Sequence, residues 1–297
     1  MPLRHDWRRG AILMLAATAL FTIMSAGVKL LSDRIPFTEI MFFRCLLAMP
    51  VVAVIVFRSG DWGLLRTRRP FGHLARAMTG TMAMGSSFFA LSLLPLPEHT
   101  ALSYTTPLFV TLLSIFFLGE RPGIHRWAAV TLGFAGIMVI AVGQGAFAGG
   151  LMAASALGVF FAVNQGFFSG LTTMLVRNLS ATEKSTTIVM WQSILMTVFT
   201  GLTLPFVWVT PGGWEVLILL GVGLTGGIAQ VLLTEAHASA QVSSLGPLSY
   251  SSILWAMLLG FVIWGDVPTL TMLGGAGMIV ASGLYILHRE LLRKKRP

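Results

Sequence analysis

Charged residues are scarce in this sequence. Of its 297 residues, 10% are charged and 55% are hydrophobic, whereas about 25% of the residues of a soluble domain carry a charge. This composition excludes a water-soluble fold. Cysteine is nearly absent, because Cys45 is the only one. A single cysteine excludes an intramolecular disulfide and any zinc or iron–sulfur site that needs several cysteine ligands.

Acidic residues are fewer than basic ones, with 11 Asp and Glu against 20 Lys and Arg. A membrane enzyme such as a lipid-linked transferase needs paired carboxylates or a metal constellation near one interface. The glutamates are instead scattered over different connections, at Glu98, Glu183, Glu215 and Glu235. We therefore expect neither an enzyme nor a cofactor. The net charge of +9 does not indicate nucleic acid, because the arginines sit between apolar runs and not on one basic face.

Long apolar runs are what the sequence has in abundance. One membrane crossing by a helix takes about 20 mainly apolar residues, and the connections between the runs leave no room for an extramembrane domain. The sequence thus predicts an all-α integral membrane protein with ten transmembrane helices. The expected spans are residues 10–31, 36–57, 71–94, 98–118, 124–142, 150–179, 185–209, 214–236, 242–264 and 269–288.

Basic residues predict the orientation of the chain. With the N-terminus in the cytoplasm, every Lys and Arg falls in a cytoplasmic segment except Lys29, Arg34 and Arg44, as expected for short loops. We expect a multi-pass membrane protein with both termini and a basic tail, 289–297, in the cytoplasm. The first run follows several arginines but shows no clear signal-peptide cleavage site, so we expect a retained helix.

Two segments of the chain resemble each other. Residues 103–106, Ser-Tyr-Thr-Thr, match 249–252, Ser-Tyr-Ser-Ser, and the Gly-Glu-Arg-Pro at 119–122 matches the Gly-Asp-Val-Pro at 265–268. The simplest account is two halves of five helices, 1–143 and 150–288. Because five is odd, the second half enters the membrane from the opposite side, which gives two inverted repeats around a central cavity near the midplane.

The Leu-Gly-Glu-Arg at 118–121 and the Trp-Gly-Asp at 264–266 resemble the repeated EamA domain of the drug/metabolite transporter superfamily. The resemblance covers nearly the whole chain. The second copy departs from it, because Asp266 replaces the usual Glu and Ile253 stands where the first copy has Pro107. Within the superfamily, the chain resembles the YddG-type exporters of aromatic and other amino acids.

This resemblance implies export of aromatic and other neutral amino acids and related small metabolites across the bacterial inner membrane. Export would proceed by alternating access, through a cavity formed by the first, third, fourth, sixth, eighth and ninth helices. A proton-coupled pump for drugs or toxic cations is the alternative, and an integral-membrane enzyme is a remote one. The pump would need an essential membrane carboxylate, and no span has a clear Asp or Glu at its middle, so exchange and histidine-based coupling both stay open. Besides the substrate, we expect only lipid as a partner and a monomeric protein.

Polar residues inside the spans are the candidate substrate-binding residues. Thr22, Ser25 and Lys29 follow one face of the first helix and could line a polar cavity. Alternatively, the hydroxyls bond their own helix and Lys29 extends to the interface. The third span adds Thr79.

Amides and phenols complete the set of candidates. Asn164, Gln165 and Gln230 could bind both charges of a zwitterion, or could only join helices. His237, at helical spacing from Gln230, could carry a coupling proton. Tyr104 and Tyr250 occupy matching repeat positions, where they could stack an aromatic ligand or simply pack.

Small residues predict where helices approach closely. The fifth and tenth helices are rich in glycine and poor in polar groups, so they should lie away from the cavity. We expect their packing faces to contain Gly133 and Gly136, and Gly274 and Gly277.

Overall fold

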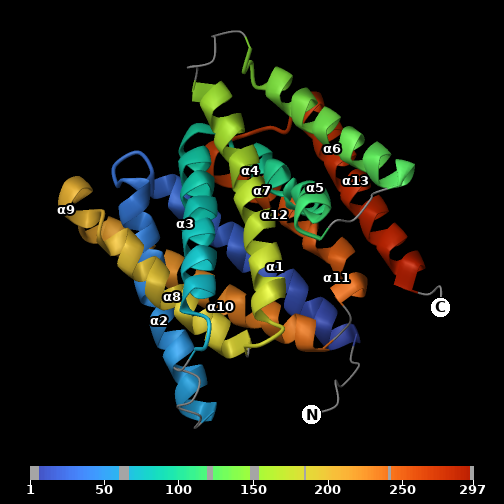
Figure 1. Cartoon of the computed structure of the whole chain (residues 1–297). Coiled ribbons are helices and arrows are strands. Elements are labelled where there is room, and N and C mark those ends of the chain that lie inside the picture. Colours follow the sequence, from blue (N-terminus) through green and yellow to red (C-terminus); the bar gives the residue numbers. More distant parts are fainter. Residues whose placement is uncertain are drawn as a thin grey trace.

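The computed structural model describes residues 7–59, 67–118, 123–147, 154–183, 185–239 and 242–294. Within these ranges all regular secondary structure is helical (Figure 1). The first part of the chain contains α1 (Trp7–Leu31), α2 (Phe37–Ser59), α3 (Pro70–Leu93), α4 (Leu96–Ser103), α5 (Thr106–Leu118) and α6 (Ile124–Gly143). The second part contains α7 (Ala154–Leu179), α8 (Ser185–Gly201), α9 (Leu204–Val207), α10 (Gly213–Ser239), α11 (Val242–Ser249), α12 (Ser251–Trp264) and α13 (Leu270–Lys294).

Each expected span contains helix, but three of the spans are not continuous. The span 98–118 is divided into α4 and α5, 185–209 into α8 and α9, and 242–264 into α11 and α12. Pro107 contributes to the first interruption, because proline has no N–H to donate to the carbonyl of Ser103. The Thr106 hydroxyl donates to that carbonyl instead, at 3.2 Å.

Several segments are long and apolar enough to cross a membrane. Among the described residues they are Trp7–Leu31, Ala154–Leu179, Gly213–Ala236, Leu245–Trp264 and Leu270–His288, and shorter apolar helices cover Trp127–Gly143 and Thr187–Gly201. Large apolar side chains are exposed along the outer helices, as Met138 on α6 and Val262 on α12 illustrate. Such a surface suits a hydrocarbon solvent.

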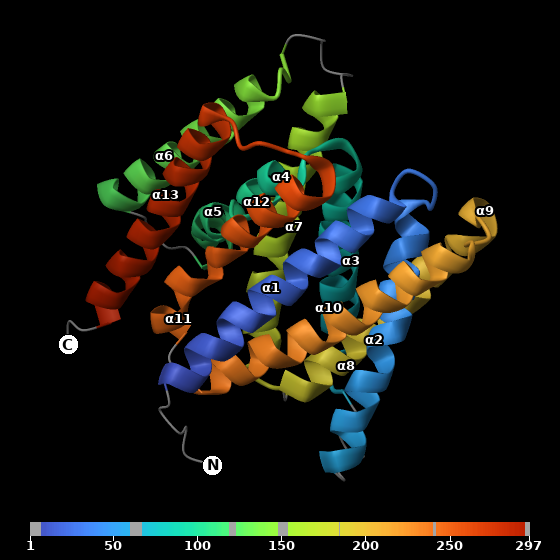
Figure 2. The ribbon, with the colours of Figure 1, turned by 180° about the vertical axis from the view of Figure 1, so that it is seen from behind.

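Three helix pairs connect distant parts of the sequence. α1 packs along α10, α3 along α7, and α6 along α13, and the last pair lies at one side of the molecule (Figures 1 and 2). All three pairs have glycine at the contact. In the first two, a Cβ on Gly27 of α1 would lie 2.7 Å from Val222 of α10, and one on Gly158 of α7 would lie 2.7 Å from Leu94 beside α3. These glycines allow close approach of the two backbones.

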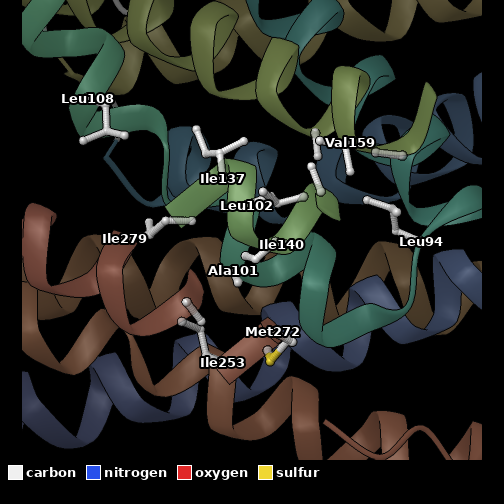
Figure 3. Close-up of a cluster of buried hydrophobic side chains, with 14 of the residues drawn as sticks. Leu94, Ala101, Leu102, Leu108, Ile137, Ile140, Val159, Ile253, Met272 and Ile279 are labelled. Atoms are coloured by element: carbon white, nitrogen blue, oxygen red, sulfur yellow. The ribbon is translucent and has the colours of Figure 1, made fainter. Parts of the chain in front are cut away.

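The buried apolar side chains form two main clusters. The larger one joins α4, α5, α6, α7, α12 and α13 and includes Leu102, Ile137, Val159, Ile253 and Ile279 (Figure 3). The second cluster joins α1, α2, α3, α10 and α12. α12 contributes to both clusters, and its N-terminal junction with α11 lies beside the larger one.

The α6–α13 contact corrects one expectation. Gly136 packs as expected, and its Cβ position lies 2.7 Å from the carbonyl oxygen of Gly275. Gly275, not Gly274 or Gly277, provides the facing surface of α13, since a Cβ at either of the other two would meet nothing within 4 Å. Gly133 packs on Leu108 of α5. Three nearby glycines allow α13 several packing faces, so composition alone could not fix its rotation.

Candidate functional site

Two of the three interrupted spans, α4–α5 and α11–α12, meet at their tyrosines and are called the interrupted helices below. Tyr104 lies between α4 and α5, Tyr250 lies between α11 and α12, and their ring centroids are 4.6 Å apart at an interplanar angle of 43°. The Tyr104 hydroxyl donates to the Ser249 carbonyl and lies 2.7 Å from the Ser252 hydroxyl. The two tyrosines at matching repeat positions are therefore in direct contact.

These hydrogen bonds follow from the interruption of the helix. A break leaves backbone carbonyls without their usual helical donor, and Tyr104 supplies a donor to Ser249 from the other half of the chain. The Tyr250 hydroxyl points at α13, where a Cβ on Gly283 would collide with it. The two rings are in tilted contact, so a ligand that enters between them would have to separate them.

A second group of polar side chains connects α7 to α3 and α4. The Asn164 amide donates to the Ser86 hydroxyl at 2.9 Å. His99 is 4% exposed, its Nε2 lies 3.1 Å from the Ser87 hydroxyl, and its ring adjoins the Gln165 amide. The His99 ring and the Gln165 amide interact with each other, but the geometry is too poor for a full hydrogen bond, and within the described part of the chain Nδ1 of His99 and Oε1 of Gln165 have no other partner. Such atoms are available to a polar ligand.

α12 adds one more unpaired donor. The buried Nε1 of Trp255 has no partner among the described residues. Trp255 follows Ser251 by one helical turn, and the Ser251 hydroxyl lies 2.9 Å from that of Thr18 on α1. The donor therefore projects from α12 on the side that packs against α1.

Lys29 lies at the α3–α4 corner, close enough to His99 to act on it electrostatically. Its Nζ donates to the Leu94 carbonyl at 2.6 Å and sits 5.5 Å from the centroid of the Trp264 ring. Close by, the Gln144 amide donates to Glu98 at 2.9 Å. Lys29 thus connects the α3–α4 corner with the end of α12 in this conformation.

The candidate hydroxyls of α1 differ in their hydrogen bonding. Thr22 donates to the Thr18 carbonyl of its own helix at 2.8 Å, as the alternative for this stripe predicted. Ser25 is half-buried, and none of the described residues forms a hydrogen bond with its side chain. Of these two hydroxyls, only that of Thr22 is bonded within its helix.

The remaining candidates are dispersed. Thr79 receives a hydrogen bond from Thr172 at 2.9 Å and donates to the Arg76 carbonyl, so it joins α3 to α7. Gln230 is exposed on α10. His237 lies in α10, but its side chain is outside the described part. The structure thus pairs the tyrosines and groups Asn164 and Gln165 with serines and a histidine.

Sequence reasoning overlooked two groups. Ser86 and Ser87 are adjacent serines in an apolar run, a signal that could have marked them. The charge pattern placed Arg76 among exposed cytoplasmic residues, but it lies inside α3 and is only 8% exposed. Its neighbours His73 and Trp191 become apparent only from the packing of α3 on α8.

Comparison with known proteins identifies the family. The sequence profile of the EamA-like transporter family matches residues 8–142 and again residues 156–287. The chain belongs to this family. It is a multi-pass membrane transporter, as expected from the sequence. A solved structure with a TM-score of 0.65, at 22% identity over 97% of this chain and 98% of the other, shares the fold.

The relatives of this family member are named for several solutes. A riboflavin transporter of Rhizobium johnstonii is 27% identical over 97% of this chain and 94% of its own. An S-adenosylmethionine uptake transporter of Rickettsia felis is 25% identical over 94% and 91%. The pseudopaline exporter CntI of Pseudomonas aeruginosa is 28% identical over 92% and 94%. These names support a small-molecule transporter, but they do not single out the YddG-type amino-acid export expected from the sequence.

Proposed function

We propose that this EamA-family protein moves a small metabolite with a planar aromatic or heteroaromatic ring across the bacterial inner membrane by alternating access. The contact of the two interrupted helices at Tyr104 and Tyr250 carries the proposal. In transporters, interrupted helices at the interface of two repeats form substrate sites, because their free backbone groups can bind polar ligands.

Helix packing supports two inverted halves, 1–143 and 150–288. α1 opens the first half and packs on α10, the third span of the second half; α7 opens the second half and packs on α3, the third span of the first. The last spans of both halves, α6 and α13, pack on each other. A twofold axis in the membrane plane generates such reciprocal pairs. With five spans in each half, we propose that the chain crosses the membrane ten times.

The orientation follows from charge. Arg8 and Arg9 at the start of α1, Arg68 and Arg69 before α3, and Arg177 at the end of α7 lie at the same end of the proposed bundle. We assign this end and both termini to the cytoplasm. The α3–α4 corner and the α12–α13 connection lie together at the other end (Figure 2), which we assign to the outer face.

The tyrosine pair closes the path between the halves in this conformation. Opening requires the Tyr104 hydroxyl to leave the Ser249 carbonyl and the two rings to part. An aromatic solute that enters between the rings would replace one stacking contact with two. We propose that the polar groups of His99, Gln165 and Trp255 bind the polar atoms of the solute once the rings have parted.

The substrate class follows from these groups and from the relatives. Riboflavin and S-adenosylmethionine each combine a heteroaromatic ring with several hydrogen-bonding atoms. Aromatic amino acids also present a ring and polar groups, so their export, in the YddG manner, is the rival assignment. We rank riboflavin first because its ring system offers the most atoms to the amide, imidazole and indole groups of the site.

Counterflow in proteoliposomes tests the proposal. Labelled riboflavin, S-adenosylmethionine and phenylalanine are each offered to vesicles loaded with the unlabelled compound, with and without a proton gradient. We expect counterflow with a ring-bearing solute, lost in Gln165→Leu and kept in Gln192→Leu, which removes a half-buried amide of α8. Counterflow only with phenylalanine would favour the rival, and counterflow with none of the three would reject the proposal.

A Gln230→Leu variant completes the comparison. Gln230 is exposed on α10, so its loss should leave counterflow unchanged when Gln165→Leu abolishes it. The opposite result would place the binding site on α10 and not at the interrupted helices. Dependence on the proton gradient would favour the proton-coupled alternative.

A further inference from the structure

Three buried hydrogen-bond donors near the start of α3 lack acceptors. His73 is 1% and Arg76 is 8% exposed, and Trp191 of α8 has a buried indole nitrogen. In the described ranges, no partner is present for Nε and Nη1 of Arg76, for either ring nitrogen of His73, or for Nε1 of Trp191. Such a group of unpaired donors is unusual in a packed bundle.

The three side chains belong to one seam between helices. The rings of His73 and Trp191 have centroids 6.0 Å apart and an interplanar angle of 32°, and Arg76 follows His73 by about one helical turn. On the other side of Arg76, Gly72 meets Leu179 of α7. Arg76 therefore lies where the α7-facing and α8-facing sides of α3 meet.

The nearby carboxylate does not neutralise Arg76. Glu183 influences His73 electrostatically, but its Oε1 accepts hydrogen bonds from the Thr67 hydroxyl at 2.8 Å and the Arg68 N–H at 3.0 Å. Among the described residues Arg76 forms no ion pair. A guanidinium buried without a counter-charge costs several kcal/mol, so an additional anionic partner is expected.

The chemistry of these donors defines the partner. A guanidinium offers donors in a fork that fits the oxygens of a carboxylate or phosphate, and an indole N–H can only donate. We propose that Arg76, with His73 and Trp191, binds an oxyanion group of the transported solute. The inference rests on the proposed transport function and extends the substrate class to ring-bearing solutes that carry a carboxylate or phosphate.

The position of Arg76 suits an intermediate binding site on the transport path. Ser86, which binds Asn164, follows Arg76 by ten residues on the same helix, a distance of about 15 Å. An oxyanion on Arg76 would therefore lie between the cytoplasmic end and the interrupted helices. Because the donors are covered in the present conformation, they would be reached when α3 and α8 separate on that side.

Thermal unfolding of the full-length protein in phosphate-free maltoside micelles tests binding. Inorganic phosphate and phenylacetate should raise the Tm of the wild type and of Arg177→Gln, which removes an exposed arginine of α7, whereas uncharged phenylethanol should not. In Arg76→Gln the apparent affinity should fall tenfold to about a hundredfold, as for loss of a charged hydrogen-bonding partner.

Two milder variants keep the test valid if Arg76→Gln fails to fold. Arg76→Lys keeps the charge but not the fork and should retain part of the response, and Trp191→Phe removes only the N–H and should weaken it. An undiminished response in Arg76→Gln, or an equal loss in Arg177→Gln, would overturn the proposal. So would stabilisation by added phosphatidylglycerol without any response to phosphate, because the ligand would then be a lipid headgroup.

Transport measurements separate this inference from the proposed function. Where counterflow is found, Arg76→Gln should raise KM for a carboxylate-bearing solute and leave KM for uncharged riboflavin unchanged. An equal rise for both would assign Arg76 a purely structural role. Absence of counterflow with every solute, together with an Arg76-dependent Tm response, would reject the transport proposal but leave the oxyanion site standing.

Discussion

Replacing Tyr104 by phenylalanine tests the contact between the interrupted helices. The variant keeps the ring, which lies 4.6 Å from that of Tyr250, and removes the donor to the Ser249 carbonyl. Hydrogen bonds between membrane helices average about 0.6 kcal/mol, whereas a buried acceptor left without its donor costs about 1–3 kcal/mol. Since this carbonyl lies at a helix interruption, we expect a loss of about 1–2 kcal/mol.

Tyr250→Phe is the matched comparison for this prediction. It removes the same atom from the facing ring, but among the described residues the Tyr250 hydroxyl has no hydrogen-bond partner. Unfolding free energies of both variants would be measured by denaturant titration in mixed micelles. Equal losses in the two variants would refute the idea that Tyr104 stabilises the junction through its hydroxyl.

Three further predictions concern backbone packing and one surface carboxylate. Gly275→Ala should destabilise by about 1–3 kcal/mol, because its Cβ would lie 2.6 Å from a backbone oxygen of α6; Gly274→Ala, beside it but in open space, should be neutral or stabilising in thermal unfolding. Gly283→Ala should displace the Tyr250 ring and lower the counterflow rate, and an unchanged rate would contradict the tight fit. Desolvation raises the pKa of Glu183, but hydrogen bonds outweigh it and lower the pKa below its ordinary 4.5. These hydrogen bonds should stabilise the fold fully above pH 4.5, and the stabilisation should be lost as the pH falls through the lowered pKa. Glu183→Gln should flatten this dependence of unfolding free energy on pH.

The helical segments could be predicted because each depends on hydropathy summed over many residues. About 20 apolar residues define each run, and a few substitutions hardly change that sum. The interruptions at Tyr104 and Tyr250 depend on a few backbone hydrogen bonds, and hydropathy does not detect them. Pro107 could have marked the first break, which the sequence analysis did not predict. The second break has no equivalent proline, because Ile253 occupies that position.

The candidate site was predictable only in part. The repeat placed Tyr104 and Tyr250 at matching positions, and an approximate twofold brings such residues together when they lie near its axis. The hydrogen bond from Asn164 to Ser86 and the approach of Gln165 to His99 depend on how α7 is rotated against α3 and α4. No periodicity within one helix contains that information.

The glycine contact between α6 and α13 has a consequence for motion. At Gly136 and Gly275 each Cβ position lies within 2.7 Å of the other residue's carbonyl oxygen, so the backbones of α6 and α13 meet without intervening side chains. Side chains could adapt to a movement through new rotamers, but a contact between backbones cannot. The Ser282 hydroxyl also donates to the Ala129 carbonyl across this seam at 2.5 Å. Such a seam has little freedom to shear. Spectroscopic labels on α6 and α13 should therefore keep a constant separation through the transport cycle. This separation can then be the fixed reference distance against which movements of the other helices are measured.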